Sequence, residues 1–197
     1  MPYKKLPRSF YLRPTLTVAK DLLGKFLVRR SGKQTLIGKI VEVEAYLGEK
    51  DPASHTYRGK TKRNEVMFKE GGHLYVYFTY GMHFCANVVT EKEGIGHAVL
   101  LRAIEPVEGI ELMKKNRGFT TDKPDKNLTN GPAKLCEALG IARNENGTDL
   151  LGVKIFITPG ESILKKQIIQ STRIGIKKGV EKRWRFYIKV NEFVSRP

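Results

Sequence analysis

Strand-like segments are frequent in this chain and often follow one another directly. Runs rich in β-branched, aromatic and aliphatic side chains occupy residues 26–30, 36–46, 73–78, 83–90, 98–104, 153–158, 167–176 and 183–190. Helical patterns are fewer and cover residues 17–23, 109–116 and a short segment from Pro132 to Gly140. Because strands outnumber helices and are often consecutive, we predict an α+β fold on a mainly antiparallel sheet.

The chain shows no internal boundary. Residues up to Pro14 are expected to form an arm, and no linker-like or low-complexity segment follows it. A chain of 197 residues is long enough to bury one sizeable core. We therefore predict a single domain spanning residues 1–197.

The chain is strongly basic, with a formal net charge of +16 and a pI near 9.9. Such a charge indicates the kind of partner that the protein binds rather than its fold, and a polyanion is the simplest partner. DNA or RNA is favoured over an anionic membrane, because there is no long apolar run and no basic amphipathic anchor. A basic surface that merely faces solvent is the alternative.

Cysteine usage and the start of the chain bear on the compartment. Cys85 and Cys136 are far apart and lack a CxxC partner, which suits a reducing compartment and argues against a structural zinc site. The start, MPYKKLPRSF, is charged and interrupted by proline, unlike a signal peptide. We expect a cytoplasmic protein.

Two glutamates lie near the end of the strand predicted at residues 36–46. Alternation places Glu42 and Glu44 on one face, and for Glu42 we expect that face to be solvent. The neighbours Ala45 and Tyr46 predict partial burial of Glu44, where a carboxylate can serve as a general base. A metal nuclease could instead use Glu42, Glu44 and Asp51 as oxygen ligands, but no tight acidic motif supports that reading.

Arg102 interrupts an otherwise apolar strand, AVLLRAI. A buried guanidinium needs an anionic or hydrogen-bonding partner. A structural ion pair is the simpler interpretation. With Glu44 and His55 nearby, Arg102 could instead help to fix a water molecule or the acid.

The segment YVYFTYGM predicts a hairpin with its tip at residues 79–82. We interpret Tyr75 as a packing residue, since aromatic side chains are common in strands. Tyr80 precedes Gly81 at the tip and is expected to project, where a planar ring could fill the gap that an extruded base leaves.

The loop HTYRGKTKRN lies between the predicted acid and the predicted tip, and it carries Arg58, Lys60, Lys62 and Arg63. Charge runs are usually just solvated. At this position, the run could also grip phosphates.

Five motifs occur in a specific order along the chain: IVEVEAYLG, DPASHTYRGKTKRN, LYVYFTYGMHFCANVV, VLLRAIEP and LTNGPAKLCEALGI. Together with the later segments STRIGI and WRFYI, they resemble the alkyladenine (3-methyladenine) DNA glycosylase family. The resemblance implies one mixed α/β domain around a curved antiparallel sheet, with a protruding β-hairpin that intercalates into DNA.

The resemblance also implies roles for individual residues. Glu44 matches the general base that activates water, with Arg102 and His55 helping to hold that water. The pocket for the flipped base would consist of Tyr46, His55, Tyr77 and Asn87, the last crowding the amino group of guanine. Tyr80 and Met82 would intercalate, and the phosphate contacts would come from Arg58, Lys60, Arg63 and Lys134.

The implied activity belongs to base excision repair: hydrolysis of the N-glycosidic bond of 3-methyladenine, 7-methylguanine, hypoxanthine or ethenoadenine in double-stranded DNA. The product is an abasic site. No lysine is placed as a Schiff-base nucleophile, so we expect a monofunctional enzyme, and a monomer without metal or organic cofactor. The rival interpretations are a non-catalytic basic nucleic-acid-binding protein and a metal-dependent nuclease.

Overall fold

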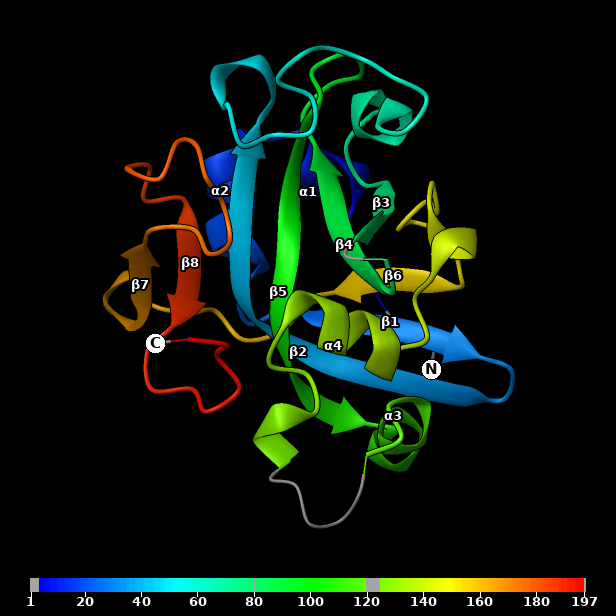
Figure 1. The fold of residues 1–197 in the computed structure, drawn as a ribbon. Coiled ribbons are helices and arrows are strands. Elements are labelled where there is room, and N and C mark those ends of the chain that lie inside the picture. Colours follow the sequence, from blue (N-terminus) through cyan, green and yellow to red (C-terminus); the bar gives the residue numbers. More distant parts are fainter. Residues whose placement is uncertain (1–3, 80, 120–124, 197) are drawn as a thin grey trace.

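The strands of the computed structural model, which describes residues 4–79, 81–119 and 125–196, form one eight-stranded sheet (Figure 1). Its order is β3-β4-β5-β2-β1-β6, with β8 paired to β2 and β7 paired to β8. Each of these pairs is antiparallel, which confirms the predicted α+β class with a mainly antiparallel sheet. The strands are β1 (Phe26–Ser31), β2 (Gln34–Leu47), β3 (Leu74–Thr79), β4 (His83–Thr90), β5 (His97–Glu108), β6 (Ile155–Thr158), β7 (Ile168–Ser171) and β8 (Arg185–Ile188).

Strand β2 is long and bent, and it organises the sheet. Its first part pairs with β1, whereas residues 42–44 pair with β8 on the same edge. Its other edge pairs with β5, with register shifts around Ile37 and around Glu42. Such irregularities bend a strand, and Figure 1 shows β2 turning between the part that pairs with β1 and the part that pairs with β8. The bend brings the end of β2, with Glu42 and Glu44, next to β8.

Four α-helices pack around the sheet: α1 (Arg8–Tyr11), α2 (Thr15–Leu22), α3 (Ile110–Asn116) and α4 (Pro132–Ala138). Figure 1 shows α1 and α2 behind the sheet and α4 in front of it. Within the arm expected up to Pro14, residues 8–11 form α1 and Tyr11 is fully buried. Helix α2 starts two residues earlier than expected, where Glu91 accepts hydrogen bonds from the backbone and hydroxyl of Thr15.

The central strands are buried on both faces. In β5, residues 98–104 are all buried, and in β2 so are residues 41–45. One continuous apolar cluster joins Val18 and Leu22 of α2 with Val43 of β2, Leu101 of β5 and Leu135 of α4. A polar side chain within residues 41–45 of β2 is therefore shielded from solvent and must find its partners inside the protein.

One predicted strand differs from the structure in a way that affects the cavity described below. The strand expected over residues 167–176 ends at Ser171 as β7, and the following residues cross over β2 to reach Glu44. At the expected hairpin, β3 and β4 pair from Leu74 and Val88 to Thr79 and His83. Tyr80 lies outside the described residues, so its projection stays a prediction.

Within the described ranges, no helix has the length and apolar character needed to span a membrane.

Candidate active site

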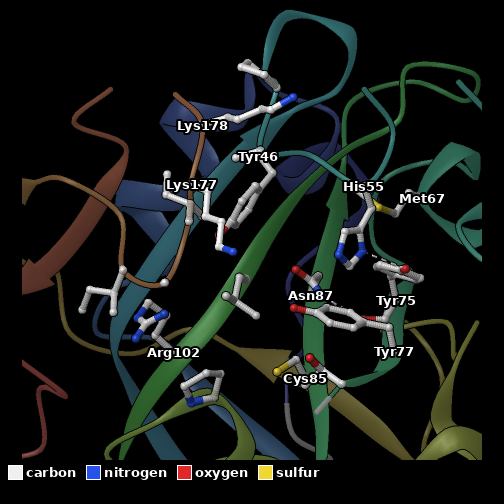
Figure 2. A pocket seen from close by; sticks show the side chains of 18 of the residues that line it. Tyr46, His55, Met67, Tyr75, Tyr77, Cys85, Asn87, Arg102, Lys177 and Lys178 are labelled. Carbon is white, nitrogen blue, oxygen red and sulfur yellow. Dashed lines mark hydrogen bonds between the residues drawn. The ribbon is translucent and has the colours of Figure 1, made fainter. Parts of the chain in front are cut away.

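A cavity of about 450 Å³ opens between the end of β2, strands β3 to β5 and the residues after β7. Figure 2 shows Tyr46 on one side and His55, Tyr75, Tyr77 and Asn87 on the other. The structure thus brings together residues 46, 55, 77, 87 and 102, all of which the sequence assigned to the site. We call the side formed by His55, Tyr75, Tyr77 and Asn87 the aromatic wall.

Glu44 lies beneath the cavity, and its side chain has no exposed surface. One carboxylate oxygen accepts a hydrogen bond from the backbone N–H of Ile174 (2.7 Å) and lies 3.3 Å from the Arg102 guanidinium. The other accepts from the Tyr46 hydroxyl at 2.8 Å. Burial raises the pKa of the Glu44 carboxyl, and Arg102 opposes that rise. The arrangement provides a carboxylate that is fixed in direction and more basic than usual.

The solvent-facing position expected for Glu42 is wrong. Its side chain is fully buried, because β8 and residues 194–196 cover this part of β2. It accepts hydrogen bonds from Arg102 Nε (3.0 Å) and Arg185 Nε (2.7 Å). The backbone N–H and the hydroxyl of Ser195 donate two more, at 2.6 and 2.9 Å. We call Glu42, Glu44, Arg102, Arg185 and Ser195 the charged floor.

Arg102 joins the two glutamates. Its Nε binds Glu42 and its Nη1 faces Glu44, so the partner that the sequence required for it is a pair of carboxylates. Burial disfavours the charged guanidinium, but the two carboxylates outweigh this effect and raise its pKa. Arg102 therefore stays a cation beside the candidate base.

His55 belongs to the aromatic wall, and none of its hydrogen bonds in the described structure reaches Glu44 or Arg102. Its Nδ1 lies 3.1 Å from the Tyr75 hydroxyl, and its ring is 4.5 Å from that of Tyr77. His55 is exposed as a whole, but desolvation on the side packed against Tyr77 and the nearby positive charge of Arg63 lower its pKa, which favours a neutral imidazole at pH 7. Its contacts suit an aromatic surface for a ligand better than direct contact with the acid.

The rest of the aromatic wall comes from adjacent strands. The Tyr75 and Tyr77 rings stack with centroids 5.6 Å apart. Asn87 donates its side-chain amide to the Tyr75 carbonyl at 3.2 Å, which fixes the direction of the amide. Tyr75, interpreted from the sequence as a packing residue, is buried and also lines the cavity, with its hydroxyl directed at His55.

Residues 174–178, which we call the strap, form a side of the cavity that was not assigned from the sequence. Arg173 anchors the strap through two hydrogen bonds to Asp51 (2.5 and 2.8 Å) and one to the Ala45 carbonyl. Neither side chain of this ion pair has exposed surface. The segment STRIGI marked the region in sequence, but only the fold shows that it reaches Glu44.

The carboxylates considered as metal ligands are each engaged by arginines. Glu42 binds Arg102 and Arg185, Glu44 faces Arg102, and Asp51 binds Arg173. Over residues 4–79, 81–119 and 125–196, no group of three or more His, Cys, Asp or Glu side chains could hold a metal ion. Glu42, Glu44 and Asp51 therefore do not form the set of metal ligands that the nuclease interpretation requires.

The predicted phosphate-binding residues lie at different depths. Arg58 and Lys60 are exposed, whereas Arg63 is exposed and also borders the cavity. Lys134 in α4 is half-buried and donates to Asn130 at 2.6 Å, and burial lowers its pKa. Of the predicted intercalating residues, Met82 is 71% exposed and Tyr80 falls outside the described residues.

Comparison with known proteins gives a consistent result. The family model described as methylpurine-DNA glycosylase (MPG) matches residues 9–192. A protein of Carboxydothermus hydrogenoformans is 55% identical over 192 residues, covering 97% of this chain and 98% of its own. Relatives from Methanoculleus marisnigri (53% identical, 97% and 98% covered) and Clostridium perfringens (47% identical, 98% and 99% covered) are similar over nearly their full length. All three carry the name "putative 3-methyladenine DNA glycosylase".

Proposed function

This chain belongs to the methylpurine-DNA glycosylase family, and on that premise we propose that it removes damaged purines from double-stranded DNA in base excision repair. It is a DNA glycosylase, and DNA is its partner. The proposed substrates are alkylated or deaminated purines: 3-methyladenine, 7-methylguanine, hypoxanthine and ethenoadenine. One observation carries the proposal, namely a buried, oriented Glu44 on the floor of a cavity that has an aromatic wall.

In the proposed reaction, Glu44 acts as the general base. A water molecule attacks C1′ of the sugar while its proton passes to Glu44. The C1′–N9 bond breaks and its electron pair leaves with the purine, so that an abasic site remains. Tyr46 and the Ile174 N–H aim the carboxylate, and Arg102 holds it in place. Water is the nucleophile, so the enzyme is proposed to be monofunctional and to need no metal or organic cofactor.

The substrate base has to leave the DNA stack to reach Glu44, because the carboxylate has no exposed surface. We propose that the flipped base lies between Tyr46 and the aromatic wall residues His55 and Tyr77. Asn87 would crowd the exocyclic amino group of guanine and so exclude undamaged guanine. The fixed direction of its amide supports this role.

The connection between β3 and β4 is proposed to enter the duplex. Tyr80 would fill the gap left by the flipped base, with the exposed Met82 beside it. Phosphates would be held by Arg58, Lys60 and Arg63 of the basic loop and by Lys134 of α4. Because the described strands share one sheet, we propose that residues 1–197 act as one domain. We also propose that the enzyme acts as a monomer.

The test is a gel assay on a duplex with one hypoxanthine or one ethenoadenine, run with and without EDTA. We expect base release that survives EDTA and a nick that appears only after alkali. A nick abolished by EDTA would support a nuclease, and no reaction would support a binding protein. A nick before alkali would contradict the monofunctional reaction and would point to an amine nucleophile such as Lys177, which borders the cavity.

A further inference from the structure

The cavity is lined by cations and has no acidic side chain on its described surface. Its basic residues are Arg63, Arg102, Lys177 and Lys178. The nearest carboxylate, Glu44, lies beneath the surface, where Arg102 already faces it. Any charged group that enters the cavity therefore meets mainly positive charge.

Lys177 is directed into the cavity. Figure 2 shows its side chain pointing inward on the side of Tyr46 and Arg102, whereas that of Lys178 runs along the rim. Neither lysine takes part in an ion pair or side-chain hydrogen bond within the described residues. The ammonium group of Lys177 thus has no counter-ion among the residues that the structure describes.

The backbone that carries Lys177 is held firmly. Four residues earlier, Arg173 is fixed by its buried pair with Asp51. The next residue, Ile174, donates its N–H to Glu44 at 2.7 Å. The strap is thereby tied to the candidate base itself, so that Lys177, although exposed to solvent, is carried on backbone anchored at the cavity.

Damaged purines differ in charge. Alkylation at N3 or N7 leaves a positive charge on the base, whereas hypoxanthine and ethenoadenine are neutral. A cationic base in a confined cavity is repelled by a nearby ammonium group. A neutral purine has no such penalty, and it gains negative charge as the electron pair of the C1′–N9 bond moves onto it. A preorganised cation stabilises that developing charge, and the departing purine then takes up a proton.

We propose that this cavity selects neutral damaged purines over cationic ones and that Lys177 sets the preference. The inference rests on the proposed function, since it assigns the substrate class of the same cavity. It goes beyond that function because excision as such needs Glu44 and the aromatic wall and does not need the charge of the strap.

The test compares single-turnover excision of hypoxanthine and of 7-methylguanine from otherwise identical duplexes. Because the ratio of the two rate constants in each variant is compared with the same ratio in the wild type, the different intrinsic reactivities of the bases cancel. Lys177→Gln should lower the hypoxanthine to 7-methylguanine ratio on the order of tenfold. Lys177→Arg, which keeps the charge, should retain the ratio. Lys178→Gln removes an equal charge from the rim and should slow both reactions alike.

An unchanged ratio in Lys177→Gln, with both rates reduced together, would overturn the proposal and assign Lys177 to a phosphate. If the wild type excised neither base, the proposed function would be contradicted, but the charge preference of the cavity would still have to be decided by another measurement. The ratio of the affinities for the two duplexes, measured for the wild type and Lys177→Gln, would then decide the charge preference. A ratio that shifts toward the cationic base in the variant supports it, and an unshifted ratio overturns it.

Discussion

The two sides of the cavity are assembled in different ways. The aromatic wall comes from residues 55–87, and its strand residues lie on the neighbouring strands β3 and β4. The charged floor joins β2 to β5, to β8 and to Ser195, which lies 153 positions after Glu42. We infer a division of labour: the wall recognises the base and the floor performs the chemistry. Substitutions in the two regions should therefore fail in different ways.

The largest effect is expected from Glu44→Gln. The amide keeps the shape of the side chain but cannot accept a proton, so excision should fall by a factor of about 10²–10⁴ or more. Binding of lesion DNA should be largely retained, because the wall is untouched. Single-turnover kinetics and a binding titration check both parts. Near-normal turnover in this variant would show that Glu44 is not the general base. It would also contradict the proposed division between recognition by the wall and chemistry on the floor.

Glu42→Gln tests whether the floor acts as one unit. The change leaves Arg102 and Arg185 short of a counter-ion, and breaking a buried pair costs about 3–5 kcal/mol. Urea unfolding should show this loss, whereas Glu137→Gln, which removes an exposed pair with Arg117, should cost about 0–1 kcal/mol. Equal losses in the two variants would mean that the floor has no special stability.

The same variant makes a prediction about pH. A base is active when deprotonated, so excision should decline as pH falls through the raised pKa of Glu44. The negative charge of Glu42 contributes to that rise. In Glu42→Gln the pKa of Glu44 should drop, and the acid limb of the rate profile should move to lower pH. If the role of Glu42 were purely structural, the acid limb of the rate profile would stay at the same pH in Glu42→Gln.

Tyr80→Ala probes the β3–β4 side of the cavity. If the ring replaces a flipped base in the stack, its loss should slow excision from paired DNA by the equivalent of about 1–3 kcal/mol. The defect should shrink when the lesion faces a gap, where flipping is already easy. An equal loss in both contexts, or a large drop in Tm, would contradict the intercalating role.

Asn87→Ser tests recognition by the wall without touching the floor. More space beside the base should admit guanine, so the ratio of hypoxanthine to guanine excision should fall, by about tenfold if one steric contact of roughly 1.4 kcal/mol is lost. The rate for hypoxanthine itself should change little. If the ratio stays as in the wild type, discrimination lies elsewhere in the cavity.

The smallest effects are expected outside both regions. Arg63→Ala and Lys134→Ala should each reduce the slope of log affinity against log salt by about 0.9, the value for one phosphate contact. Lys134 is half-buried and bonded to Asn130, so its effect should be the weaker of the two. An affinity that does not depend on salt would contradict an electrostatic role for the +16 charge.

The same contrast explains what could be predicted from the sequence. The strands and the antiparallel pairing follow from local patterns, because β3 and β4 are adjacent in the chain. The wall residues His55, Tyr77 and Asn87 were assigned through the family resemblance, and Tyr75 was interpreted as a packing residue only. Glu42 was misplaced because alternation describes one strand and cannot show that β8 and Ser195 cover it. The Arg173–Asp51 pair, 122 positions apart, was invisible for the same reason, and with it the approach of Lys177 to the cavity.

The distance in sequence between Glu42 and Ser195 has a consequence during synthesis. All residues of the aromatic wall have been made once residue 87 has been added, but the charged floor remains incomplete until residue 195 is made. At ribosomal rates, this interval is roughly 5–20 s. The candidate base Glu44 is made early, but the hydrogen bonds that Ser195 donates to the neighbouring Glu42 can form only near the end of synthesis. Any chain interrupted in that interval is expected to leave the buried Glu42 without these two hydrogen bonds.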